Sequence, residues 1–387
     1  MTGLVIISVA VIIIWLIYKY SRKEDDYSRT TDHYNRNPKG YNKEINTSPS
    51  YANNRKHSTP PPKVEKKGIF SQLFERKPSL PFDDKAITWC ANFLSVDENA
   101  LRLILAYQSN YYKKFLLGKR SGGYRTISAP QEPLISIQRT IYRRILAPVN
   151  IHPAATGFRH KKSVADNARP HLGKDYMLKV DIIDFFGSIK RDTIRKTFQK
   201  IGYPLNIAEV LTFLCCLRGQ LPQGAPTSPA LSNIVAYEMD QQLYALATEN
   251  NLTYTRYADD ITLSGNSLAK DEILPAIQRI VGEARFRIKH KKTRYMTPNR
   301  RKIITGISVS SGEKLTIPKT TKREIRKNVH FITTRGLNRH QQHIKSQDPS
   351  YLKRLIGQLC FWHSIEPQNE YVQKSLDVLK KIEKRIR

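Results

Sequence analysis

The chain has 387 residues, and its 65 lysines and arginines outnumber 33 aspartates and glutamates, which gives a formal net charge of +32. A hydrophobic content of 40% over this length is enough for a core and excludes a wholly disordered polycation. Such a protein is expected to bind a polyanion, either nucleic acid or an anionic membrane surface, rather than a small acidic metabolite.

The positive charge is unevenly distributed along the chain. Residues 1–85 carry 15 basic and 9 acidic groups, residues 86–284 carry 24 and 17, and residues 285–387 carry 26 and 7. More than half of the excess therefore lies in the last quarter. The four cysteines show no CxxC spacing, so neither a zinc site nor a disulfide framework is predicted.

The N-terminus contains an uncharged apolar run, GLVIISVAVIIIWLIY, followed by Lys19, Arg22 and Lys23. The run is slightly short for about 30 Å of hydrocarbon, so residues 1–20 are predicted to form a transmembrane anchor with help from its flanks. A cleaved secretory signal and a buried helix are the alternatives. The basic C-terminal flank predicts that the body of the protein lies in the cytoplasm.

Residues 21–80 are rich in Asn, Ser, Thr, Pro, Lys and Tyr and show no helical or strand periodicity. This composition predicts a flexible, disordered linker. Its interleaved tyrosines and basic residues could touch single-stranded nucleic acid, but a solvated linker is the favoured interpretation. Globular composition begins near Leu80, with a helix-like run ITWCANFLSVDENALRLILAYQ.

A glycine-rich basic turn follows in YYKKFLLGKRSGGYRTISAP, where Gly118, Gly122 and Gly123 surround Lys119 and Arg125. Backbone amides and cations in such a turn could bind a phosphate group. A solvent-facing hairpin tip is the alternative interpretation.

Three carboxylates provide the main functional indication. Asp181 ends a short apolar strand in LKVDIIDFFGSI, and Asp259 and Asp260 lie between two β-type runs in TYTRYADDITLSG. A single aspartate at a strand end is often only a cap, but adjacent carboxylates at a hairpin tip, facing a third, repel one another unless divalent cations neutralise them. Because side chains alternate along a strand, Asp259 is expected to be the more direct ligand and Asp260 the less direct one.

The cluster suits phosphoryl transfer with two metal ions, and oxygen ligands favour Mg²⁺, with Mn²⁺ as a substitute. Between the two acidic segments, LPQGAPTSPALSN leads into a predicted long amphipathic helix, with Ser228 as its cap and Pro229 in its first turn. A nucleotide could lie against the backbone near Gln223.

The segments resemble the conserved blocks of reverse transcriptases. YRTISAP, GFR, KVDIIDFF, LPQGAPTSPALSN, YADD, KKTR and ITGISVS occur in the order of that family and span roughly residues 115–310. The segment NARPH is similar to the NAxxH signature of retron reverse transcriptases, and ITG resembles their VTG triplet. On composition alone, NARPH would be a cap with a surface histidine and ITG a strand end.

The resemblance implies an α+β right-hand polymerase fold, with fingers, a palm built on an antiparallel sheet and a helical thumb. The apolar run and the polar segment after it add one transmembrane helix and a flexible linker before this fold. The expected fingers and palm cover residues 81–318. Residues 319–387 are expected to form a basic helical thumb that also takes part in RNA recognition and grips nucleic acid through its phosphates.

The resemblance also implies residue roles. Asp181, Asp259 and Asp260 become the catalytic metal ligands, with the carbonyl of Ile182 as an additional ligand. Lys292 becomes a catalytic proton donor to the leaving pyrophosphate, although the basic run around it would also suit plain phosphate contact.

Nucleotide binding is assigned by the same resemblance to Lys119, Arg125, Asp184, Phe185, Phe186 and Gln223. Phe186 matches the aromatic side chain that would collide with a ribose 2′-hydroxyl and so select deoxynucleotides. RNA recognition is assigned to Asn167, His171, Ile304, Thr305 and Gly306.

The expected function is that of a retron RNA-directed DNA polymerase of the bacterial inner membrane. It would copy a cognate structured non-coding RNA, which is both template and primer, into single-stranded, branched RNA-linked DNA (msDNA), from dNTPs. The expected partners are that RNA, the DNA product, the membrane through residues 1–20, and an effector protein encoded nearby, with anti-phage defence as the physiology.

Two other functions stay open on the sequence. One is another bacterial reverse transcriptase, either a group II intron relative or an abortive-infection polymerase. The other is a catalytically silent, membrane-tethered RNA-binding scaffold, which would have no reason to keep three clustered carboxylates in a polycation.

Overall fold

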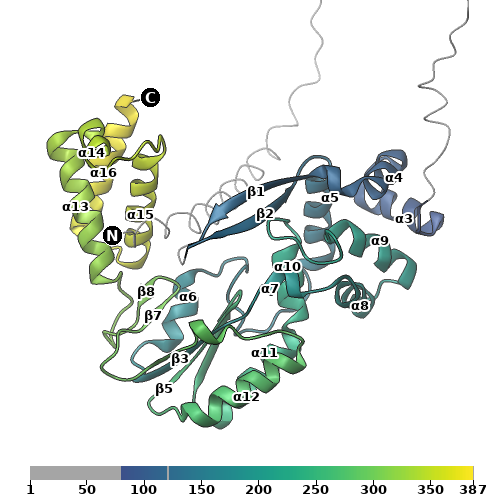
Figure 1. Ribbon diagram of the computed structural model, residues 1–387, viewed down its shortest axis with the longest axis horizontal. Helices are drawn as coiled ribbons and strands as arrows, with labels where there is room; N and C mark the ends of the chain where they lie inside the picture. The colour runs from purple at the N-terminus through teal and green to yellow at the C-terminus, as the bar shows by residue number, and fades with distance from the viewer. Residues whose placement is uncertain (1–79, 120–121, 387) are drawn as a thin grey trace, which may run out of the picture. The chain divides into compact units, whose positions relative to one another are not determined.

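A computed structural model describes residues 80–119 and 122–386 of the chain (Figure 1). It begins with the amphipathic helices α3 (Asp84–Leu94) and α4 (Glu98–Ala106), each started by an aspartate whose carboxylate accepts a backbone N–H. The predicted anchor, residues 1–20, lies outside the described residues, as does the predicted linker apart from its last residue.

A hairpin and several short helices follow along the chain. They are η1 (Gln108–Tyr111), β1 (Tyr112–Gly118), β2 (Tyr124–Pro130), α5 (Leu134–Ile141), the π-helical turn η2 (Tyr142–Leu146), α6 (Val164–Ala168) and η3 (Arg169–His171). β1 and β2 pair antiparallel along their full lengths. The predicted glycine-rich turn is the tip of this hairpin.

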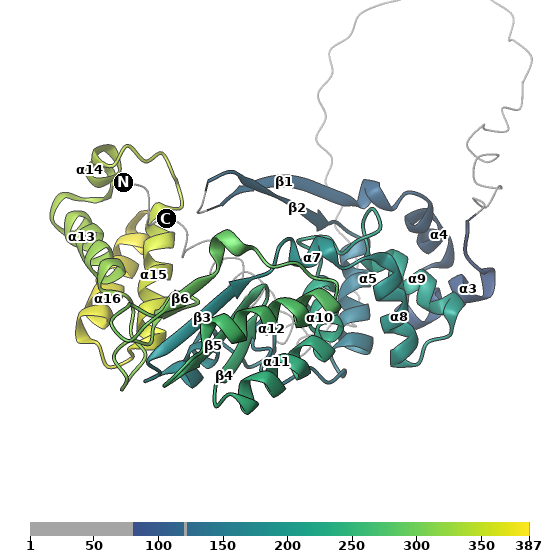
Figure 2. The same cartoon turned by 60° about the horizontal axis from the view of Figure 1, so that its bottom comes forward.

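A four-stranded antiparallel sheet with strand order β4-β5-β3-β6 lies at the centre of the fold (Figure 2). Its strands are β3 (Tyr176–Asp181), β4 (Thr253–Tyr257), β5 (Asp260–Gly265) and β6 (Arg294–Met296). Helices α11 (Tyr237–Glu249) and α12 (Lys270–Glu283) cover one face in Figure 2.

The opposite face of the sheet packs against α6. Leu178 belongs to the main core, whereas its neighbour Met177 belongs to a second core with Ala168 of α6. Adjacent residues of a strand point to opposite faces, so the two cores lie on the two sides of β3.

The other helices of the central part are α7 (Phe185–Ser188), α8 (Arg191–Ile201), α9 (Leu205–Cys215) and α10 (Ser228–Val235). The predicted long helix after Pro229 is in fact α10 and α11, separated at Ala236. Ser228 is not the cap either, because its hydroxyl donates to the carbonyl of Pro222 at 2.7 Å and so closes the preceding loop.

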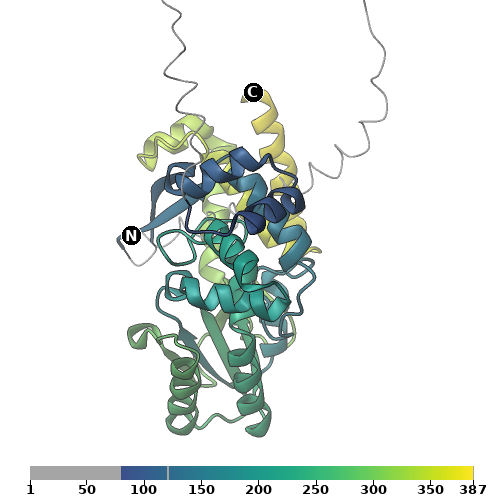
Figure 3. The same cartoon turned by 90° about the vertical axis from the view of Figure 1, so that its right-hand side faces the viewer.

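The C-terminal helices form a bundle with its own core (Figures 1 and 3). A short hairpin, β7 (Ile303–Ile304) and β8 (Ile307–Ser308), precedes α13 (Lys319–Arg335), α14 (Leu337–His343), α15 (Tyr351–Ile365) and α16 (Glu370–Ile386). Trp362 is fully buried at the centre of this bundle. The short 3₁₀ turn η4 (His290–Lys292) precedes β6. We call α13–α16 the basic bundle.

The predicted inner-membrane localisation is contradicted by the structure. Across residues 80–119 and 122–386, no helix is long and apolar enough to cross a bilayer. The longest helices there, α13 and α16, have 17 residues each and are rich in lysine and arginine, whose charges are costly in hydrocarbon.

Candidate active site

The predicted carboxylates meet at one end of the central sheet. Asp181, the last residue of β3, pairs directly with Asp260, the first residue of β5. Directly opposed residues project from the same face of a sheet, so these two carboxylates face the same side. This register, which alternation along a single strand does not reveal, places Asp260 directly opposite Asp181.

Asp259 occupies the turn that joins β4 to β5. The preceding residue, Ala258, has φ +56° in the left-handed region, and the Ile182 N–H donates to the Asp259 carbonyl at 2.9 Å. Burial raises the pKa of Asp259 to about 6, and the negative charges of Asp260 and Asp181 add to this effect.

This electrostatic arrangement fits a divalent cation. Like charges opposite one another on two strands destabilise the pairing, and a bound cation would reverse that effect. Lys179 offers only partial compensation, with its Nζ 3.9 Å from an Asp260 oxygen. In the described part of the chain, no three acidic, histidine or cysteine side chains are already arranged around a common point as metal ligands.

Lys292, predicted as a proton donor to the leaving pyrophosphate, contacts the Asp181 carboxylate. Its Nζ lies 2.9 and 3.2 Å from the two Asp181 oxygens, and the N–H of Lys289, three residues earlier, donates to the Asp181 carbonyl. The lysine side chain is 44% exposed, so this ion pair can open at little cost. The ammonium is thus held beside the carboxylates and is free to exchange partners.

Phe185 and Phe186 follow β3 in the short helix α7. Phe185 is buried and packs on Phe286, whereas Phe186 is half-buried, with its ring centroid 5.9 Å from that of Phe158. Of the two rings, Phe186 is therefore the one with a partly exposed face, as a contact with substrate requires.

Asp184 has a left-handed backbone, with φ +45°, and its carboxylate lies over Gly187, where any Cβ would collide with it. The absence of a side chain at Gly187 therefore leaves room for the Asp184 carboxylate in this tight turn after β3.

The loop that carries Gln223 packs against the strand that carries Arg125. The Gln223 carbonyl accepts the Ser128 N–H of β2 at 2.8 Å. Gly224 has φ +124°, and a Cβ there would lie 2.8 Å from Ile127. The structure thus joins two segments almost a hundred residues apart. Arg125 and Lys119 are both exposed near the tip of the β1–β2 hairpin.

Asn167 and His171, predicted to recognise RNA, are buried beneath the central sheet. The His171 ring nitrogens lie 2.6 Å from the Ser264 hydroxyl of β5 and 2.8 Å from the Thr255 hydroxyl of β4. Asn167 accepts a hydrogen bond from the Thr156 hydroxyl at 2.8 Å. Both side chains thus make hydrogen bonds within the fold that support the strands around the carboxylates.

The ITG segment, Ile304 to Gly306, packs against α6, the helix that carries Asn167. Ile304 is fully buried, and the Thr305 hydroxyl donates to the Val164 carbonyl of α6 at 3.2 Å. Thr305 and Gly306 both have positive φ and are partly exposed at the turn between β7 and β8. In the same second core, Phe361 and Ile365 of α15 connect the turn to the basic bundle.

Replacing His171 with alanine tests its buried position. We expect the free energy of unfolding to fall by about 2–4 kcal/mol, because two buried hydroxyls lose their partner and a cavity remains. Urea denaturation measures this loss, and exposed His160→Ala should leave the midpoint unchanged. RNA affinity per folded molecule should be retained. A larger loss of affinity than of folded protein would instead support direct recognition of RNA by His171.

The contribution of His171 to the free energy of unfolding should decrease as the pH falls. Burial, and then the charges of Lys179 and Lys174, lower the pKa of His171 to about 3. The unfolded histidine titrates near 6.5, so the unfolded chain binds the extra proton, and this contribution to stability is lost as the pH falls below about 6.5. The alanine variant should lack this dependence.

One polar cluster was not predicted from the sequence. Arg256 of β4, Asp240 of α11 and Tyr254 of β4 form a buried network next to the Asp259 turn. The sequence signal for this cluster was an arginine in the β-type run before YADD, since a strand buried on both faces should not carry an unpaired charge.

Comparisons with known proteins agree with this site. Residues 117–346 match the family described as reverse transcriptase (RNA-dependent DNA polymerase). The Retron Ec86 reverse transcriptase of Escherichia coli is 30% identical over 295 residues, covering 75% of this chain and 87% of that protein. The Retron Ec83 reverse transcriptase of the same organism is 29% identical, covering 72% and 93%.

Two further likenesses cover smaller shares of the compared proteins. The Retron Mx65 reverse transcriptase of Myxococcus xanthus is 34% identical over 220 residues, covering 52% of each chain. Among solved structures, apo telomerase from Candida tropicalis is similar at 11% identity with a TM-score of 0.41, over 70% of this chain and 55% of that one.

The family match includes all three carboxylates, and the retron relatives cover most of the described residues. The chain therefore belongs to the retron-type reverse transcriptases and is an RNA-directed DNA polymerase.

Proposed function

We propose that this polymerase copies a cognate structured non-coding RNA into single-stranded DNA that stays joined to the RNA by a branch. The pairing of Asp181 with Asp260 beside Asp259, in a chain similar to retron enzymes, is the observation that carries the proposal. The RNA would serve as template and would supply a 2′-hydroxyl as primer.

The carboxylates of Asp181, Asp259 and Asp260, with the carbonyl of Ile182, would hold two Mg²⁺ ions, or Mn²⁺ in their place. Such ions activate the attacking hydroxyl and stabilise the leaving pyrophosphate. Lys292 would leave Asp181 as the cations bind and donate a proton to the pyrophosphate. Its distance of 2.9 Å from Asp181 supports this role, because the ammonium already lies beside the reacting centre.

The incoming dNTP would be bound by residues of the β1–β2 hairpin and of the loop that carries Gln223, which a hydrogen bond from Ser128 joins. Arg125 and Lys119 are exposed cations suited to the triphosphate, and the Gln223 backbone is tied to β2 beside them. Phe186 would lie against the sugar. Asp184 and Phe185 would support it from the same turn of chain.

The basic bundle is proposed to hold the template, the product duplex and the cognate RNA. An open pocket between α13 and α14 is lined by Phe331, Arg335, Arg339, His340, Gln342 and His343. It combines aromatic rings with cations and contains no acidic side chain, which suits a nucleotide with its phosphate. The partly exposed turn of Thr305 and Gly306 would add RNA contacts next to this bundle.

The physiological proposal is anti-phage defence together with an effector protein encoded nearby. It depends on the similarity to retron enzymes and on no individual side chain. Loss of protection in cells when Asp259 is replaced would support it. Undiminished protection by an inactive enzyme would contradict it.

The nucleic acid that co-purifies with the full chain tests the proposed reaction. We expect one short DNA species that is sensitive to DNase, attached to RNA through a branch, and released by an enzyme that cleaves 2′–5′ linkages. Purified protein with that RNA, dNTPs and Mg²⁺ should regenerate it. Unlinked DNA of many sequences would favour another reverse transcriptase lineage, and bound RNA without DNA synthesis would favour a scaffold.

A further inference from the structure

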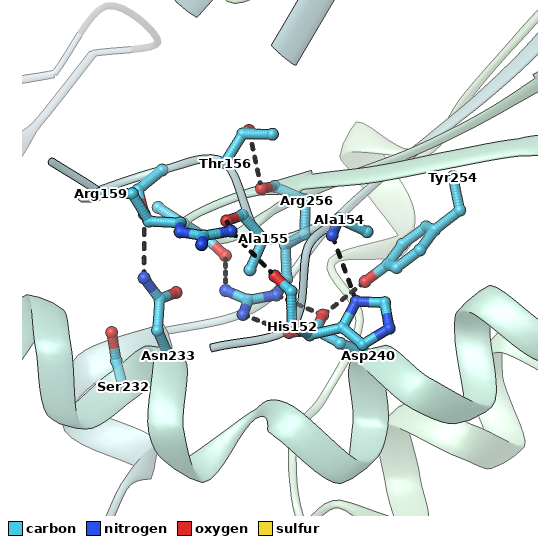
Figure 4. A network of polar contacts seen from close by, with 12 residues as sticks. His152, Ala154, Ala155, Thr156, Arg159, Ser232, Asn233, Asp240, Tyr254 and Arg256 are labelled. Carbon is cyan, nitrogen blue, oxygen red and sulfur yellow. Dashed lines mark hydrogen bonds and ion pairs between the residues drawn. The ribbon is translucent and has the colours of Figure 1, made fainter. Parts of the chain in front are cut away.

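A fully buried ion pair lies directly behind the Asp259 turn. The side chains of Arg256 and Asp240 are both 0% exposed, and two parallel hydrogen bonds join them at 2.6 and 2.7 Å (Figure 4). The Tyr254 hydroxyl donates to the same carboxylate at 2.6 Å. Every charged group in this cluster therefore has a close partner.

Arg256 also contacts the turn itself. Its Nη1 donates to the Ala258 carbonyl at 3.0 Å, which belongs to the peptide group that joins Ala258 to Asp259. Ala258 is the residue with the left-handed backbone, a conformation that costs a non-glycine residue about 1 kcal/mol or more. The arginine thus orients the peptide plane on which the Asp259 side chain depends.

The same guanidinium contacts the first phenylalanine after Asp181. Its Cζ lies 5.5 Å from the centre of the Phe185 ring, within the range of a cation–π contact. One buried side chain therefore touches both segments that supply the carboxylates, the one after β3 and the one between β4 and β5.

The backbone around the turn is held from a second side. The Arg256 N–H donates to the Ala154 carbonyl at 2.8 Å, and the Thr156 N–H donates to the Arg256 carbonyl at 2.9 Å. Gly157 packs so closely that a Cβ there would lie 2.8 Å from the Ala258 nitrogen. The Asn233 amide, labelled in Figure 4, donates to the Gly157 carbonyl at 2.9 Å.

Stability alone does not account for this pair. Removing two charges from water costs several kcal/mol per ion, and well-packed apolar residues of similar volume often stabilise a fold as well or better. A bidentate arginine with a third bond to the turn instead imposes one geometry, which an apolar side chain cannot do.

We propose that Arg256, held by Asp240, is a positioning residue that sets the Asp259 turn for cation binding. The proposal rests on the metal-binding role of Asp259 proposed above. Arg256 itself touches neither substrate nor cation.

Arg256→Lys in the full chain is the test, because lysine keeps the charge but cannot form the planar fork and the third bond together. DNA synthesis is measured on a poly(rA) template primed with oligo(dT), over a range of Mg²⁺ concentrations. We expect the Mg²⁺ concentration for half-maximal activity to rise at least about 10-fold, the loss typical of residues that orient metal ligands. The KM for the primed template should be unchanged.

Arg102→Lys is the matched control. Arg102 is also buried and paired with two carboxylates, Asp84 and Glu98, but it lies in α4, near the start of the described chain. Its replacement should lower stability and leave the Mg²⁺ requirement at the wild-type value. A wild-type requirement in Arg256→Lys, with activity lost only in proportion to folded protein, would overturn the proposal.

Two further variants keep the test decisive. If Arg256→Lys does not fold, Tyr254→Phe removes only one hydrogen bond to Asp240, and a rise of about 2–5-fold in the Mg²⁺ requirement is expected, because the carboxylate loses part of its orientation. An unchanged requirement would count against positioning. Retained synthesis by Asp259→Asn would refute the metal site itself, which is a separate outcome from failure of the positioning role.

Discussion

Asp259→Asn is expected to lower the rate of single-nucleotide addition by at least about 10³-fold, which corresponds to about 4 kcal/mol of transition-state stabilisation. The amide keeps the size of the side chain but not its negative charge, so cation binding between Asp259, Asp181 and Asp260 is weakened at the point where charge develops. Single-turnover extension of a primed RNA template measures the change.

Asp377→Asn is the matched control for this prediction. Asp377 is exposed in α16 and undergoes the same chemical change away from the sheet. It should retain wild-type activity. DNA synthesis by Asp259→Asn within about 10-fold of wild type would mean that the assigned carboxylate is not a required ligand, since loss of a direct ligand removes several kcal/mol.

Asp259→Asn should lower activity but raise the stability of the folded chain when divalent cations are absent. The pKa of Asp259 in the folded chain is about 6, above its ordinary value of 3.8, so the folded state binds more protons within this window. Stability therefore falls as the pH rises from about 4 through 6, and the asparagine variant lacks this penalty. Thermal melts in EDTA should show a higher Tm for the variant at pH 8 and convergence toward pH 4.

Phe186→Ala should relax discrimination against ribonucleotides by about 10²-fold, since removing a steric clash abolishes a specific penalty against the 2′-hydroxyl. The half-buried ring lies next to Phe158, with their centroids 5.9 Å apart. The ratio of kcat/KM for dTTP and UTP on the same primed template measures the effect, and most of the change should come from UTP.

Phe213→Ala is the control for this loss of an aromatic ring. Phe213 of α9 is also half-buried, but it packs against Phe82 and lies away from the β3–α7 turn. Its replacement should leave the ratio unchanged. If Phe186→Ala keeps wild-type discrimination while remaining active, another side chain sets sugar selection.

Local sequence patterns predicted the family and the enzyme class, because each pattern depends on neighbouring residues. The strand before Asp181, the hairpin around Asp259 and the basic charge of the last quarter are all contiguous features. Their order along the chain indicated the reverse transcriptase family, which the comparisons confirmed. The predicted inner-membrane localisation was wrong, because no helix within residues 80–119 and 122–386 is long and apolar enough to cross a bilayer.

What the patterns could not decide were relations between distant segments. Asp260 faces Asp181 because of the register between β3 and β5, which alternation within one strand does not reveal. His171 is buried because α6 and η3 pack beneath that sheet, and its ring finds two hydroxyls from separate strands.

From the sequence alone, the acidic cluster, the family and the basic C-terminal region could be determined. The tertiary structure decided which carboxylates share a face, which signature residues are buried, and that Arg256 and Asp240 meet behind the Asp259 turn. The physical reason is that side-chain type and local period are encoded within a few residues, whereas strand register and buried ion pairs depend on packing between segments far apart in the chain.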